Sequence, residues 1–154
     1  MVAVHKITGD FFEEAFILIA LHSSLPDYAL VYGVNNCLKA NFKRSRKDLD
    51  VSNSVSFPFF EWEDDIKDRY WTLISNFSNK EESTVTTSLF KDEPTFTTHH
   101  LIPEHKEIDY FLKIEEDEAH MVEDILKALV TIPKIITAYE LDAENLKSKN
   151  NLIF

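Results

Sequence analysis

A short stretch of the sequence, residues 99–110, brings carboxylates and histidines together. Its carboxylates include Glu104 and Asp109, and its histidines are His99, His100 and His105. Paired carboxylates perform acid–base chemistry when their surroundings push their pKa values apart, and histidine titrates near neutral pH. One hypothesis is therefore an enzyme of unfamiliar type that uses Glu104, Asp109 and one of these histidines in a cleft.

The same carboxylates have a structural interpretation, which we favour. The chain carries 27 Asp and Glu residues and a net charge of −11, so neighbouring acids are expected without any shared chemistry. Asp109 would accept a hydrogen bond from the backbone or pair with Arg44 or Arg46. Glu104 would cap or bridge a turn.

Motifs for metals and cofactors are missing from the sequence. His99 and His100 are adjacent, so on a strand they would point to opposite faces and could not share one ion. No HxxxH or Cys/His zinc spacing occurs, and two glycines are too few for a glycine-rich phosphate loop. The single Cys37 falls on an apolar helical stripe, as a small core residue would. We expect no metal, no cofactor and no assigned catalytic residue.

A basic cluster occupies residues 39–47 and contains five Lys or Arg residues, Arg44 and Arg46 among them. Such a cluster could bind an anion or a nucleic-acid backbone, and aromatic residues further along could stack on bases. The net charge of −11 opposes binding to phosphates. We therefore interpret the cluster as local counter-charge and the aromatics as core, and keep an RNA-associated accessory protein as a weaker hypothesis.

A strand is expected to carry the second half of the stretch. Apolar side chains alternate from residue 108 to residue 114, with Ile108, Tyr110, Leu112 and Ile114 on one face. Before them, Pro103 lacks a backbone N–H and biases the preceding residue away from helix. The stretch is therefore predicted to be a turn that leads into a buried strand.

Two short runs in this stretch are separated by three residues: Ile102-Pro103-Glu104 and Ile108-Asp109-Tyr110. They resemble the signature of the IPExxxVDY family, small bacterial proteins found mainly in the Bacteroidetes, with Ile108 in place of the family's Val. Residues 111–114 and Asp48-Leu49-Asp50 also resemble the family pattern, and the resemblance extends over nearly the whole chain. It implies a source but no activity, and it singles out Glu104, Asp109 and Tyr110, whose expected role is structural.

The order strand, turn, amphipathic helix, strand occurs twice in the chain, in residues 16–51 and 110–141. The elements are expected at 16–21, 27–41 and 42–51, and again at 110–115, 119–130 and 134–141. We predict a single α+β domain over residues 1–154. It would be an antiparallel sheet with two helices on one face, forming a ferredoxin-like split βαβ core with an inserted β-meander at 52–102.

Within this insertion, strands are expected at 55–63 and 70–77. A polar loop is expected at 76–83, and a hairpin of 85–90 with 96–102. The N-cap of the first helix is expected at Ser24 or Asp27.

The composition is that of a soluble globular protein. One cysteine suits a reducing cytoplasm, the first residues do not resemble a secretion signal, and the apolar run 16–21 is too short to cross a membrane. The sequence favours a non-enzymatic binding or interaction module in the cytoplasm. Its partner would be an unknown protein or a small ligand, or a second copy in a homodimer through a sheet edge, but neither nucleic acid nor a membrane.

Overall fold

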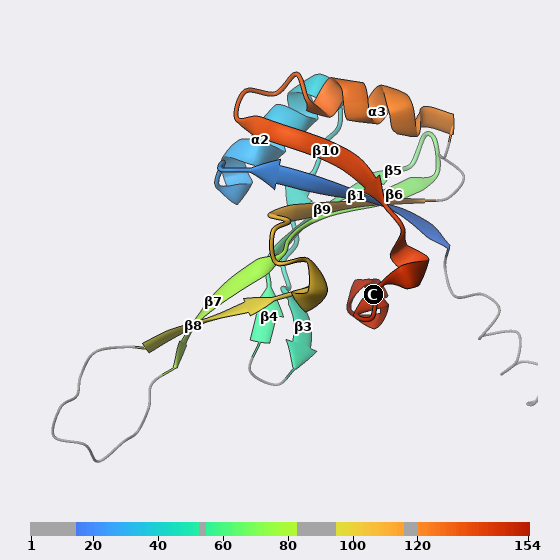
Figure 1. The fold of residues 1–154 in the computed structure, drawn as a ribbon. Helices are drawn as coiled ribbons and strands as arrows, with labels where there is room; N and C mark the ends of the chain where they lie inside the picture. Colours follow the sequence, from blue (N-terminus) through green and yellow to red (C-terminus); the bar gives the residue numbers. More distant parts are fainter. Residues whose placement is uncertain (1–14, 53–54, 83–94, 116–119) are drawn as a thin grey trace, which may run out of the picture.

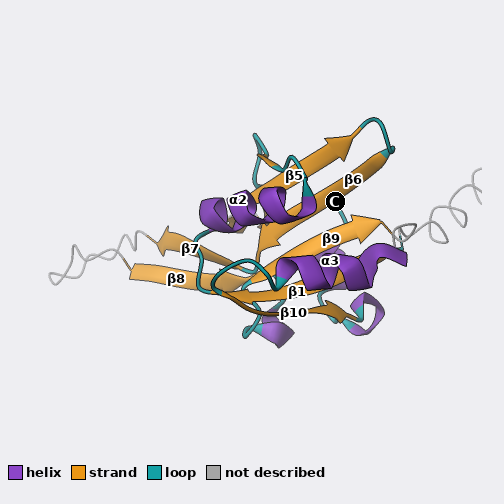
Figure 2. Ribbon diagram, turned by 90° about the horizontal axis from the view of Figure 1, so that it is seen from above, coloured by secondary structure: helices purple, strands orange, loops and turns teal. Residues whose placement is uncertain are grey.

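The computed structural model describes residues 15–52, 55–82, 95–115 and 120–154. Its largest element is a six-stranded sheet of order β10-β1-β9-β6-β5-β2, in which every neighbouring pair is antiparallel. The strands are β1 (Phe16–Ser23), β2 (Lys43–Arg44), β5 (Phe59–Asp64), β6 (Arg69–Ser75), β9 (Tyr110–Glu115) and β10 (Ile135–Leu141). Two helices, α2 (Asp27–Leu38) and α3 (Val122–Leu129), lie side by side over one face of this sheet (Figure 1, Figure 2). The predicted α+β class, with two helices and an antiparallel sheet, is confirmed.

Strand β1 is buried on both faces, as its continuous apolar run predicts. Ile17, Ile19 and Leu21 point toward the helices and join the first core cluster. Leu18 and Ala20 point to the opposite face and join a second cluster. The strand lies between β9 and the edge strand β10 in the main sheet.

Strand β9 follows the predicted alternation from its first residue onward. Tyr110, Leu112 and Ile114 lie in the helix-side cluster, and Phe111 lies in the opposite one. Ile108 departs from the prediction, because it packs on the side of Phe111. The strand begins only at Tyr110, so the period of two does not extend back into the turn.

The second face of the sheet is covered by short segments. They are the two-stranded sheet of β3 (Leu49–Ser52) and β4 (Val55–Phe57), the 3₁₀ turn η1 (Pro103–His105), and two C-terminal 3₁₀ turns, η3 (Ala143–Asn145) and η4 (Lys149–Leu152). In Figure 1 the C-terminal turns lie below the sheet, opposite the helices. Leu146 and Leu152 are buried there, so the end of the chain docks on the core.

The strand predicted at 42–51 is wrong in its extent. The segment forms β2 and β3, which belong to different sheets, and β6 occupies the position beside β9. Five exposed charged residues lie between the buried Phe42 and Leu49, and no strand face can bury them. The Arg44 guanidinium bridges the bend to Asp48, four residues ahead.

The polar loop predicted at 76–83 is also wrong. Residues Phe77–Glu82 form β7, which pairs with β8 (Thr95–His100) in a separate two-stranded sheet. The backbone carries this pairing, so the hydrophobic pattern gave no sign of it. The strand predicted at 85–90 lies outside the described residues. The strand predicted at 55–63 divides at Pro58, which has no N–H to donate to a ladder.

The N-cap of helix α2 is neither of the two predicted residues, Ser24 and Asp27, but lies between them. Pro26 is the N-cap, and the Asp27 carboxylate instead accepts a hydrogen bond of 2.6 Å from the N–H of Tyr28. The helix buries the predicted stripe of Leu30, Val31 and Val34. It ends at Leu38, where Lys39 turns into the left-handed region with φ of 52°.

Candidate functional site

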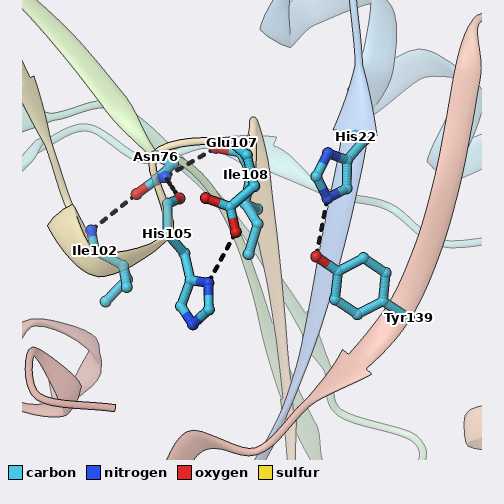
Figure 3. Close-up of polar contacts among 7 residues, drawn as sticks. All are labelled: His22, Asn76, Ile102, His105, Glu107, Ile108 and Tyr139. Carbon is cyan, nitrogen blue, oxygen red and sulfur yellow. Dashed lines mark hydrogen bonds and ion pairs between the residues drawn. The ribbon is translucent and has the colours of Figure 1, made fainter.

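The turn that carries the motif of residues 102–110 is held by one buried amide, that of Asn76. Its Nδ2 donates to the carbonyl oxygens of His105 and Ile108 at 2.9 and 2.8 Å, and its Oδ1 accepts from the N–H of Ile102 at 2.8 Å (Figure 3). Its backbone also donates to the oxygen of Asp109 and accepts from Leu101. The Nδ2 and Oδ1 atoms of the Asn76 side chain are thus both used to fix this turn.

Asp109 and Tyr110 attach the same turn to the end of β1 and to the segment that leads into α2. The Asp109 carboxylate accepts a hydrogen bond of 2.8 Å from the N–H of Ser23, at the end of β1. The Tyr110 hydroxyl donates to the carbonyl oxygen of Leu25 at 2.6 Å. Burial raises the pKa of Tyr110 to about 12, with a further contribution from the nearby Asp27 and Asp109 carboxylates. Asp109 thus satisfies a backbone group, one of the two expected roles, while Arg44 pairs with Asp48 instead.

Glu104 faces the C-terminal cover, which is the segment of η3 and η4 (residues 143–152) on the second face of the sheet. Its carboxylate oxygens accept from the N–H and the hydroxyl of Ser148, both at 3.1 Å. This is the bridging role that the sequence predicted for it. The side chain is exposed, so these bonds hold a surface contact between η1 and the segment before η4.

The enzyme hypothesis requires Glu104, Asp109 and a histidine to meet within hydrogen-bonding distance. Among the described contacts they do not meet: Glu104 bonds to Ser148 and Asp109 to Ser23. The histidine of the turn, His105, bonds through Nδ1 to Glu107 at 2.9 Å. The groups are thus directed to three different parts of the chain.

Near this turn lies a second polar pair that the sequence gave no reason to expect. His22 Nε2 and the Tyr139 hydroxyl are 2.9 Å apart, and their rings stack at 5.5 Å (Figure 3). The hydrogen bond with His105 lowers the pKa of Glu107, while burial and then Glu107 raise the pKa of Tyr139. His22 and Tyr139 are 117 positions apart in the sequence, so no local motif could reveal this pair. Its groups bond to one another at the surface and line no described cavity.

The basic cluster and the aromatic residues do not form a common surface. Arg44 is engaged by Asp48 and by the carbonyl oxygen of Ser45, and Arg46 is exposed. Among the aromatics, Trp62 and Trp71 pack edge to face at 5.2 Å, and the Arg69 guanidinium covers both rings. These aromatic rings are thus packed within the protein, as the core interpretation expected.

A pocket of about 440 Å³ opens between α2 and the turn at 131–133 that follows α3. Its walls include Leu25, Tyr32, Asn36, Cys37 and Ile132, and none of the residues that line it carries a charge. Burial raises the pKa of the Cys37 thiol, which keeps it in its neutral form. The sequence predicted Cys37 on an apolar stripe, but it gave no sign of the pocket, because the lining comes from two distant segments.

Where Gly33 and Ile132 line this pocket, α2 comes very close to the turn. A Cβ added to Gly33 would lie 2.8 Å from Ile132 Cγ2. Gly33 therefore marks a close packing contact, because its missing side chain lets the helix and the turn meet. Because both residues line the pocket, this contact joins its two walls.

In the part of the chain that the structure describes, no group of three or more His, Cys, Asp or Glu residues could hold a metal ion. No described helix is long and apolar enough to cross a membrane. In comparisons with known proteins, no family model, no curated protein and no solved structure matches this chain.

Proposed function

We propose that this protein is a non-enzymatic binding module and that its binding site is the pocket between α2 and turn 131–133. The observation that carries the proposal is the uncharged pocket itself, with the exposed Tyr32 on its wall. Pockets of about 300–1,000 Å³ with mostly apolar walls and a few polar groups are typical of ligand sites.

The bonding partners of the family-like motif also support the proposal, because they give its residues a structural role. Asp109 and Tyr110 bond to the backbone of Ser23 and Leu25, and Glu104 bonds to Ser148. These bonds tie β9, the end of β1 and the C-terminal cover together. The motif is therefore architectural in this proposal, and the binding site lies elsewhere.

The proposal extends to fold type and source. A ferredoxin-like split βαβ core is supported by the strand order, because β1 and β6 both pair antiparallel with β9, which lies between them. In the same way, β9 and β10 flank β1. Membership of the IPExxxVDY family, and with it a bacterial source, is supported by the motif at 102–110. A cytoplasmic location is supported by the single cysteine.

The proposal can be tested by nuclear magnetic resonance with the full ¹⁵N-labelled chain. An extract of the native host is separated by filtration into a small-molecule and a macromolecular fraction, and each is added in turn. We expect one fraction to shift the amide signals of α2 and 131–133 and to leave those of 101–110 in place. No shift with either fraction would contradict the proposal. Consumption of a small molecule with shifts at 104–109 would support the enzyme hypothesis instead.

A further inference from the structure

We propose that the ligand of the pocket is a neutral, planar and mostly apolar small molecule that stacks on Tyr32 and hydrogen-bonds to Asn36. This inference rests on the proposed function, because it names the class of ligand for the same pocket.

The absence of charged residues among those that line the pocket disfavours ionic ligands. None of the residues that line the pocket is charged, although the whole chain has a net charge of −11. An ionic ligand would lose hydration there without gaining an opposite charge, which is costly. A neutral ligand does not incur this cost.

The walls favour a flat, apolar body. Leu25, Ile132 and Pro133 supply aliphatic surface, and the Tyr32 side chain is 71% exposed beside them. An exposed aromatic ring gains from stacking with another ring beyond the burial of area alone. Two of the lining residues, Gly33 and Ile132, are in close contact in the free protein, so this part of the site is formed before the ligand arrives and ordering it costs little on binding.

One polar group remains available to orient the ligand. Asn36 is exposed on α2, and within the described residues its side-chain amide has no protein hydrogen-bond partner. By contrast, the Thr131 hydroxyl donates to the oxygen of Ala128 and the Cys37 thiol lies 3.6 Å from the oxygen of Val34. The Asn36 amide can therefore accept from, or donate to, one polar atom on the ligand edge.

Cys37 provides the readout, because it is the only cysteine of the chain and lines the pocket. Indole serves as the probe, since it is neutral and planar and carries one N–H donor. The rate at which iodoacetamide alkylates Cys37 is measured in the full chain at increasing indole concentration. At ten times its Kd, indole is expected to slow alkylation about tenfold, because only about a tenth of the protein remains free. Indole-3-carboxylate, which adds one negative charge, is expected to protect much less.

Two tyrosines of α2 form a matched pair of variants. Tyr32 lines the pocket and is 71% exposed, whereas Tyr28 lies one turn earlier, is 72% exposed and does not line it. Both replacements leave the core untouched, and circular dichroism checks folding. Tyr32→Ala is expected to raise the Kd of indole about five- to tenfold, and Tyr28→Ala to leave it unchanged.

Three results would overturn this inference: no protection of Cys37 by indole, equal protection by indole-3-carboxylate, or an equal loss of affinity for indole in Tyr32→Ala and Tyr28→Ala. If the pocket signals respond to the macromolecular fraction of the extract but indole does not protect Cys37, the proposed function stands and the ligand class is wrong. If the pocket signals do not respond to either extract fraction and indole does not protect Cys37, the proposed function and the ligand class are both wrong.

Discussion

Asn76 is the residue on which the turn at 101–109 depends most. It is fully buried, and its side chain bonds to Ile102, His105 and Ile108, which lie 26 to 32 positions further along the chain. The sequence placed it in a polar loop, because an asparagine beside serines and lysines is typical of one. Only the folded chain brings the partners together, so no local pattern could have predicted this role.

Replacing Asn76 by Asp is expected to destabilise the protein by about 3 kcal/mol. The new carboxylate can still accept from the N–H of Ile102, but it cannot donate to the carbonyl oxygens of His105 and Ile108. Urea unfolding measures the loss. Asn151→Asp is the control, because Asn151 donates only one such bond, to the oxygen of Leu101, and about 1 kcal/mol is expected there. Equal losses in the two variants would contradict the role assigned to Asn76.

Tyr110 is expected to make stability depend on alkaline pH. Its pKa is raised to about 12 in the folded protein, against about 10 in an unfolded chain. The unfolded state therefore loses its proton first, and stability that is complete below pH 10 falls between pH 10 and about 12. Tyr70, whose pKa burial and Glu61 also raise to about 12, adds to the same fall.

In Tyr110→Phe, the fall in stability between pH 10 and 12 is expected to be smaller than in the original protein. At neutral pH the variant loses about 1 kcal/mol with the hydrogen bond to Leu25. Urea unfolding at pH 7, 10 and 12 measures both effects. Tyr28→Phe is the control at neutral pH, since no described contact of the Tyr28 hydroxyl is lost. An unchanged alkaline fall in Tyr110→Phe would show that Tyr110 is not its source.

At the scale of elements, the contact between Gly33 and Ile132 determines how closely α2 approaches the turn that follows α3. Glycine inside a helix costs about 1 kcal/mol relative to alanine, so its presence at position 33 indicates a requirement for space. The sequence could predict that requirement, but it could not identify the neighbour, Ile132, which is 99 residues away.

Gly33→Ala is expected to lower the free energy of unfolding by about 1 kcal/mol, because the clash with the buried Ile132 outweighs the gain in helix propensity. Ile132→Leu moves the branch away from Cβ and so removes Cγ2, the atom in conflict. The double variant is therefore expected to lose about 1 kcal/mol less than the sum of the two single variants. Additive losses in urea unfolding would argue against this contact.

At the scale of the whole molecule, the periodicity of apolar residues predicted those helices and strands that bury apolar faces in the core. The apolar run of β1, the alternation of β9 and the stripes of α2 and α3 each bury one or two faces, so their spacing is visible in the sequence. The prediction of one strand at 42–51 failed because exposed charged residues divide the segment into β2 and β3. The prediction of a loop at 76–83 failed because polar side chains conceal a strand that backbone pairing stabilises. Of the candidate site, the structural roles of Glu104 and Asp109 could be predicted. The pocket could not, since its walls come from residues 25–37 and 131–133.

The C-terminal cover is expected to be part of the core rather than an appendage. Leu152 is fully buried in the second cluster, whereas the next residue, Ile153, is 39% exposed. Leu152→Ala is therefore expected to cost about 2–4 kcal/mol. Ile153→Ala is the neighbouring control, with less than about 1 kcal/mol expected. Thermal unfolding distinguishes the two, and similar melting temperatures would mean that the cover contributes little to stability.

We propose that the residues of the motif at 102–110 are architectural and that the pocket beside α2 is the binding site. The most direct test records the response of the α2 amide signals to the active extract fraction in three folded chains. These are the original protein, the double variant Glu104→Gln with Asp109→Asn, and Tyr32→Ala. We expect an unchanged response in the double variant and a weakened one in Tyr32→Ala. A response lost in the double variant but kept in Tyr32→Ala would contradict this proposal and place the function in the motif.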